Sequence, residues 1–220
     1  MAVYVTLGQD LSKRRINYRR LIQRHMLGAK WKKREIEVQR LMRDPDGELK
    51  RYSGAAEKNI HNIGVECFSE TNENLLMWSH YAQHHRGFVL QFDLAKDIQT
   101  LLRASKVEYL DKYPVWDVGE ITHEDIRPVL LRKHPGWSYE QEWRIVVPNG
   151  ARTSLKFKPD ALMGLTFGCR ADLDFKKRVR KILEIRASKS FPPLKIYEAV
   201  KHPREYKVTI QEDHSLIWPS

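Results

Sequence analysis

The chain has 220 residues, of which 41% are hydrophobic and 30% are charged, a composition typical of a folded globular protein. No apolar run approaches the roughly 18 residues that cross a bilayer. The first residues do not form a secretory signal, and two cysteines are too few for a disulfide framework. We therefore expect a cytoplasmic protein without a membrane span, whose net charge of +11 favours anionic partners.

The first quarter of the chain concentrates this charge. Residues 10–51 carry 14 Lys or Arg against 6 Asp or Glu. Apolar residues at helical spacing predict helices over 11–27, 30–43 and 52–61, after a segment of strand composition at 1–7. We expect residues 1–60 to form a basic helical arm. Residues 10–43 of this arm are expected to contact nucleic acid or an acidic protein surface, although a solvated helical face would have the same composition.

Strands and helices mix from residue 61 to residue 220. Strands are predicted over 65–69, 87–93, 106–110, 142–147, 155–158, 162–168, 194–199 and 206–210. Helices are predicted over 72–84 (capped by Thr71 or Asn72), 95–103, 123–132 and 172–186, with a loop over 113–119. The predicted fold class is α+β. We expect the main strands to form one mixed sheet, packed by the helices at 72–84 and 172–186 and preceded by the basic arm.

Polar and aromatic groups gather where the strand at 65–69 meets the next helix, a usual place for ligands. Ser69 lies at the strand end, where its hydroxyl either orients a ligand or caps the following helix. Trp78, His80 and Tyr81 follow on that helix, although a single Trp on a helix is most often a core residue. His80 and His84 are four residues apart but lack an evident third ligand, so no metal is expected.

The segment Trp137-Ser138-Tyr139-Glu140-Gln141-Glu142-Trp143-Arg144 is the second candidate for a functional site. A strand period of two puts Glu140, Glu142 and Arg144 on one face. Two neighbouring carboxylates repel each other, and the cation of Arg144 can offset this repulsion. One interpretation is a catalytic carboxylate that bonds a sugar hydroxyl and stabilises an oxocarbenium-like centre. The other is a strand with an ordinary Glu–Arg pair.

These segments carry a resemblance to a known family. The string from Cys67 to Gly87, the strand from Phe88 to Asp93, the motif ending in Glu140-Gln141-Glu142-Trp143-Arg144 and the strand from Leu162 to Gly168 resemble a large bacterial family of unknown function. This resemblance covers residues 60–210 and implies no established activity.

Two of the motifs also resemble those of ADP-ribosyltransferases. Phe68-Ser69-Glu70-Thr71 is similar to their second motif, and Glu140-Gln141-Glu142 is similar to their third. The resemblance implies that NAD is cleaved at its nicotinamide–ribose bond. Ser69 would then support the ribose, Glu142 would bond the ribose 2′-hydroxyl, and Tyr81 or Trp78 would stack on the nicotinamide. The Tyr-rich strand and Asn-Asp-Pro segment that usually open that family have no match here, which implies a shortened or inactive member.

Three hypotheses for function therefore stand side by side. The first is an ADP-ribosyltransferase-like enzyme with catalytic Ser69, Glu140, Glu142 and Arg144 and with NAD bound by Ser69, Trp78, His80 and Tyr81. Its target would be nucleic acid or a host or phage component. The second is a non-catalytic nucleic-acid-binding module led by the basic arm. The third is a structural or interaction protein in which the Glu–Arg pair only stabilises the sheet.

Overall fold

The computed structural model describes residues 4–6, 11–47, 60–117 and 129–213, which divide into two compact units. Unit 1 comprises residues 1–66, 107–138 and 146–153, and unit 2 comprises residues 67–106, 139–145 and 154–220. The α-helices whose bounds lie within the described residues are α1 (Leu11–His25), α2 (Trp31–Arg43), α4 (Leu75–Tyr81) and α6 (Leu173–Ser188). The predicted boundary between an arm at 1–60 and a domain at 61–220 stays a prediction.

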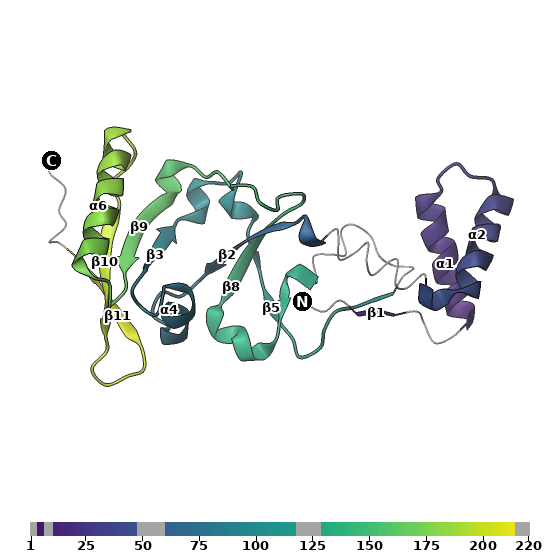
Figure 1. The fold of residues 1–220 in the computed structure, drawn as a ribbon, viewed down its shortest axis with the longest axis horizontal. Helices are drawn as coiled ribbons and strands as arrows, with labels where there is room; N and C mark the ends of the chain where they lie inside the picture. The colour runs from purple at the N-terminus through teal and green to yellow at the C-terminus, as the bar shows by residue number, and fades with distance from the viewer. Residues whose placement is uncertain (1–3, 7–10, 48–59, 118–128, 214–220) are drawn as a thin grey trace. The chain divides into compact units, whose positions relative to one another are not determined.

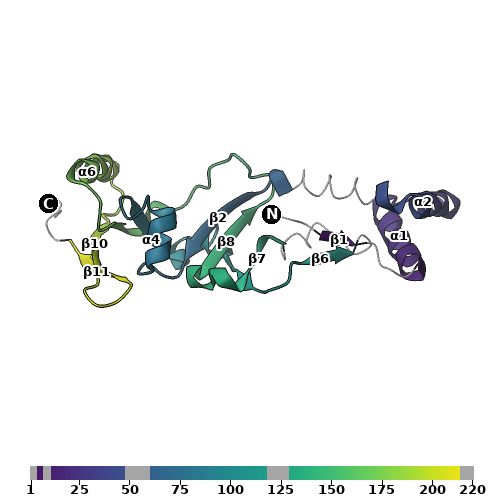
Figure 2. The same cartoon turned by 60° about the horizontal axis from the view of Figure 1, so that its bottom comes forward.

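Unit 1 contains an antiparallel pair of helices, α1 and α2, which lie side by side in Figures 1 and 2. The apolar spacing of both helices buries one face of each against the other. The small core that results consists of Tyr18, Leu21, Ile22, Val38 and Leu41. The predicted helical N-terminal region is thus confirmed, whereas the predicted helix at 52–61 lies almost wholly outside the described residues.

A carboxylate joins the two helices of this hairpin. Glu35 of α2 accepts hydrogen bonds from Arg15 and Arg19 of α1, with Arg19 Nε and Glu35 Oε2 3.1 Å apart. Hydrogen bonds from Arg19 and Arg15 lower the pKa of Glu35 from its ordinary value of 4.5 to about 2. Glu35 therefore favours the folded hairpin in its ionised form.

We expect the stabilisation by Glu35 to be complete above pH 4.5 and to disappear as the pH falls toward about 2. The test compares the free energy of unfolding of the wild-type chain with that of Glu35→Gln, measured by urea denaturation across this pH range. The two curves should be separated at neutral pH and converge in acid. A separation that stays constant down to pH 2 would show that the two arginines do not act through the Glu35 charge.

The strands that lie wholly within unit 1 are short. β1 (Tyr4–Thr6) pairs in parallel with β6 (Val115–Asp117), and β5 (Glu108–Tyr109) pairs in parallel with β7 (Arg132–Lys133). The loop predicted over 113–119 is therefore wrong at β6, because its backbone finds a partner in β1. Most of the helix predicted over 123–132 lies outside the described residues, and Arg132 belongs to β7.

Unit 2 is built on a four-stranded sheet in the order β11-β10-β9-β3. Its strands are β3 (Phe88–Phe92), β9 (Leu162–Phe167), β10 (Lys195–Lys201) and β11 (Val208–Glu212). β9 and β10 are parallel and are connected through α6, as parallel neighbours require a crossover. The other pairs are antiparallel, so the sheet is mixed. Figure 1 shows α6 along this sheet.

The two helices predicted to pack on the sheet, α4 and α6, do so, and they lie on opposite faces of the four-stranded sheet. Val179 and Leu183 of α6 pack on one face against Leu165, Phe167 and Ile196. Trp78 of α4 packs on the other face against Ala199 and Val208. Ile196 and Ala199 of β10 thus point to opposite faces of the sheet and belong to different cores, as the strand period of two requires.

The prediction of one sheet is wrong, because three strands form a sheet of their own in the order β2-β8-β4. They are β2 (Gly64–Ser69), β8 (Glu142–Val147) and β4 (Ser105–Lys106). The strand predicted over 106–110 divides between two sheets: β4 pairs with β8, whereas β5 pairs with β7. Val107 lies between them and is buried, so the chain changes sheets around an apolar side chain.

One side chain of unit 2, that of Asp97, accounts for two further departures from the predicted elements. The helix predicted over 95–103 is instead a pair of 3-10 turns, Leu94–Lys96 and Leu101–Arg103. The carboxylate of Asp97 lies between these turns, and it accepts hydrogen bonds from the backbone N–H groups of Thr100 (3.0 Å) and Lys158 (2.8 Å). The second bond occupies the backbone of the predicted strand at 155–158, which is irregular.

Candidate functional site

The first motif forms the end of β2 and the start of α4. Residues 65–69 are extended as predicted, but α4 begins at Leu75 rather than at residue 72. The cap is Asn74, whose side-chain oxygen accepts from the backbone N–H of Leu76 at 2.9 Å and of Met77 at 3.3 Å. The predicted caps, Thr71 and Asn72, are therefore wrong.

The helix α4 also ends earlier than predicted. It stops at Tyr81, and Gln83, His84 and His85 adopt left-handed φ values of 48°, 53° and 67°. His84 consequently leaves the helical face that carries His80, and its ring lies 3.5 Å from the Ser79 hydroxyl. Within the described residues, no group of three or more His, Cys, Asp or Glu side chains is placed to hold a metal ion.

The second motif crosses from a 3-10 helix, η4 (Pro135–Glu140), into β8. The predicted strand period does not extend back to Glu140. Gln141, which separates Glu140 from Glu142, has a left-handed φ of 45° and interrupts the extended backbone. Both glutamates are nevertheless buried, Glu140 with 2% and Glu142 with 5% of its surface exposed. A buried carboxylate requires hydrogen-bond partners, and each of the two has its own.

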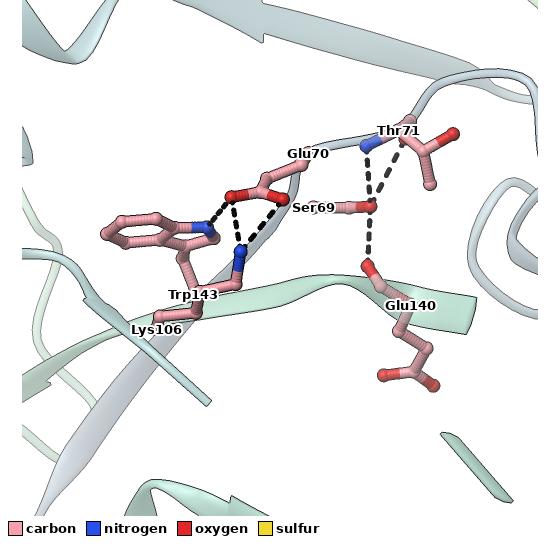
Figure 3. Close-up of polar contacts among 6 residues, drawn as sticks. All are labelled: Ser69, Glu70, Thr71, Lys106, Glu140 and Trp143. Carbon is pink, nitrogen blue, oxygen red and sulfur yellow. Dashed lines mark hydrogen bonds and ion pairs between the residues drawn. The ribbon is translucent and has the colours of Figure 1, made fainter. Parts of the chain in front are cut away.

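Ser69 connects the two motifs, although it lies 71 residues from its partner in the sequence. Its hydroxyl donates to the backbone carbonyl of Glu140 at 2.7 Å and accepts from the backbone N–H of Thr71 at 3.1 Å. Next to it, the Glu70 N–H donates to the carbonyl of Gln141 at 3.1 Å. Figure 3 shows the Ser69 hydroxyl between these backbone groups, with the carboxylate of Glu140 directed away from it. Ser69 thus fixes the backbone of the Glu-x-Glu turn, residues 140–142, rather than capping α4.

Tyr81 is the partner of the Glu140 carboxylate. Its hydroxyl donates to Glu140 Oε1 at 2.9 Å. The Tyr81 residue is 63% exposed, and the His80 ring lies beside it with the centroids 6.2 Å apart. The buried carboxylate therefore holds the tip of an aromatic ring whose body remains accessible to a ligand.

Trp78 has a different position from Tyr81. It is 1% exposed, packs beneath the four-stranded sheet and donates from Nε1 to the Asn72 carbonyl at 2.6 Å. This is the core position that a single helical Trp most often takes. Of the two rings considered for stacking, only Tyr81 is exposed.

Glu142 and Arg144 form a pair with two hydrogen bonds, as their spacing predicts. Arg144 donates from Nε to Glu142 Oε1 at 2.8 Å and from its terminal nitrogen to Oε2 at 2.9 Å. Burial lowers the pKa of Arg144, but the hydrogen bonds and charge of Glu142 outweigh it, with a smaller effect from Cys67, so the pKa lies above its ordinary value. The guanidinium of Arg144 is therefore held in its charged form.

A third carboxylate, that of Glu70, was not among the predicted site residues but connects the strands beside Ser69. Glu70 accepts from the indole Nε1 of Trp143 at 2.7 Å and from Nζ of Lys106 at 3.0 Å. The hydrogen bond from Lys106, followed by that from Trp143, lowers the pKa of Glu70. Figure 3 shows this carboxylate between the two donors, which come from β4 and β8. The cluster ties together the end of β2 and the two other strands of the sheet.

Comparison with known proteins supports the expected similarity to a family of unknown function over part of the chain. Residues 77–145 match the model of a family described as "Protein of unknown function (DUF2971)". The matched segment contains Tyr81 and the second motif through Arg144, whereas Ser69 precedes it. No match was found among curated proteins or among solved structures. The described chain also has no helix of the length and apolarity needed to span a bilayer.

Proposed function

We propose that this protein is an ADP-ribosyltransferase-like enzyme that uses NAD. The observation that carries the proposal is the hydrogen bond from Ser69 to Glu140, because it places the Ser-containing strand end against the Glu-x-Glu turn. The proposed reaction needs these two motifs at one site. In that site the Glu-x-Glu turn would face the ribose whose bond to nicotinamide is broken.

The chemistry assigns the turn an electrostatic role. As the bond between ribose C1′ and the nicotinamide nitrogen breaks, its electron pair leaves with nicotinamide and positive charge develops on the ribose. A carboxylate that accepts a hydrogen bond from the 2′-hydroxyl stabilises this charge. The acceptor then bonds to C1′ through an oxygen or nitrogen atom and loses a proton.

Glu142 is the proposed carboxylate. Both of its oxygens accept hydrogen bonds from Arg144, and a sugar hydroxyl would have to share the carboxylate with these bonds. The residue is buried, which means that the Arg144 side chain would have to move for the ribose to approach. Ser69 acts as a positioning residue for the turn, and the exposed Tyr81 ring offers a stacking surface for nicotinamide.

The test is incubation of the full chain with labelled NAD, with and without RNA, DNA or cell lysate. We expect label transfer by the wild-type protein and a loss of roughly a hundredfold in Glu142→Gln, which removes the charge but keeps the shape. Tyr81→Phe should retain more transfer than Tyr81→Ala, because it keeps the ring. Glu184→Gln, an equal charge change on the exposed surface of α6, is the matched control.

Two results would contradict the proposal. The first is no transfer by the folded wild-type protein with any of these acceptors. The second is equal transfer by wild type and Glu142→Gln. Circular dichroism of each variant separates loss of activity from loss of folding.

A further inference from the structure

We propose that the hairpin of α1 and α2 binds single-stranded nucleic acid, with its cations on phosphates and the indole of Trp31 stacked on a base. This inference is independent of the NAD chemistry, since it rests on residues 11–43 alone. The first support is charge: these residues contain twelve Lys or Arg but only two acids, Glu35 and Glu37. A surface of this kind attracts a phosphate backbone and releases its counterions.

The positions of the two acids strengthen the argument. Glu35 accepts from Arg15 and Arg19 between the helices, and Glu37 accepts from Arg40 at 2.7 Å on α2 itself. Both acids therefore form ion pairs within the hairpin and stabilise its fold. Lys30, Lys32 and Lys33 at the start of α2 are exposed, whereas each of the two acids already accepts hydrogen bonds from arginines.

An aromatic side chain stands among those lysines. Trp31 is the first residue of α2 and is 66% exposed, so its indole lies outside the small buried core of the hairpin. The exposed indole offers a large flat aromatic face to a ligand. An indole flanked by cations is the arrangement on which single-stranded bases stack, because every base has a π face while its phosphates pair with neighbouring charges.

Single strands fit this surface better than a duplex. Bases within a duplex are already stacked on one another, so they do not offer a free face to Trp31. The cations alone would serve either ligand. The contribution of Trp31 therefore distinguishes the two forms of nucleic acid, and it also distinguishes nucleic acid from an acidic protein surface.

The experiment measures binding of the full chain to a short single-stranded DNA of mixed sequence, to the matching duplex and to polyglutamate at several salt concentrations. We expect the tightest binding to the single strand. Trp31→Ala should weaken it about tenfold, whereas Trp31→Phe should retain most of it. Lys32→Gln with Lys33→Gln should reduce the slope of log affinity against log salt by about 1.4.

The matched control is Lys181→Gln with Lys189→Gln, which removes the same charge from exposed positions on and next to α6. It should leave the affinity within about twofold, because these lysines are not part of the proposed surface and make no phosphate contact there. Equal binding to the duplex or to polyglutamate, or an affinity that Trp31→Ala does not change, would overturn the proposal. An equal loss in the control pair would also overturn it, since binding would then follow net charge alone.

Discussion

Arg144→Met is expected to lower the free energy of unfolding by about 3–5 kcal/mol. The substitution keeps most of the apolar stem but removes the guanidinium that donates to both oxygens of Glu142. The Glu142 side chain is only 7% exposed, so its charge would be left in the interior without this partner. Urea denaturation at neutral pH measures the loss.

The double variant Glu142→Leu with Arg144→Met separates charge from packing. Replacing both partners of a buried ion pair with apolar residues is often nearly neutral, so we expect the double variant to regain most of the stability. A double variant as unstable as Arg144→Met would show that the shape of Arg144 matters rather than its charge. Strong recovery together with unchanged label transfer would favour the structural interpretation of the pair.

The regular elements could be predicted because their local patterns agree with the final packing. In α1, α2 and α6, apolar residues at helical spacing became the buried faces that form the cores around Leu21 and Leu183. The apolar run of β9 was recognisable for a similar reason, since this strand has neighbours on both edges and helices on both faces of its sheet. Division of the strands between two sheets depends on long-range pairing, which no local pattern contains.

Where α4 ends and where β8 begins depends on tertiary contacts that no local sequence pattern indicates. Gln83, His84 and His85 take left-handed conformations without a glycine among them, and Gln141 does the same between the two glutamates. Such conformations are unfavourable locally and persist only when surrounding structure fixes them. A strand period therefore could not predict where Glu140 lies.

The candidate site was predictable as a set of residues but not as a set of contacts. The motifs identified Ser69, Tyr81 and Glu140, which the structure brings into hydrogen-bonding distance. The sequence could not show that Ser69 uses the carbonyl of Glu140 while Tyr81 uses its carboxylate. Glu70 was missed because an acid next to a serine has no distinctive spacing. Its proximity to the indole N–H of Trp143 arises only when β2 and β8 join one sheet.

Gly168→Ala is expected to destabilise the protein by roughly 3 kcal/mol, because the added methyl group has no room. Gly168 follows the last residue of β9 and lies against the left-handed turn after α4. A Cβ atom at this position would be 2.1 Å from the carbonyl oxygen of His85. That carbonyl accepts from Arg170 N–H at 3.0 Å, and Gly168 N–H donates to Gly87 at 2.9 Å. Relief of the clash would therefore require these backbone bonds to separate.

Gly136→Ala provides the matched control for this prediction. A Cβ at Gly136 would lie 3.1 Å from the Nδ1 atom of His134, which belongs to a side chain that can rotate. Its free energy of unfolding should remain within about 0.5 kcal/mol of the wild-type value, as is usual for surface substitutions. Thermal and urea unfolding of both variants measure the difference. If Gly168→Ala were as stable as Gly136→Ala, the backbone at 83–87 would be able to move away from the added methyl group without lowering the free energy of unfolding. The left-handed residues of this turn would then not be fixed by their contact with the end of β9.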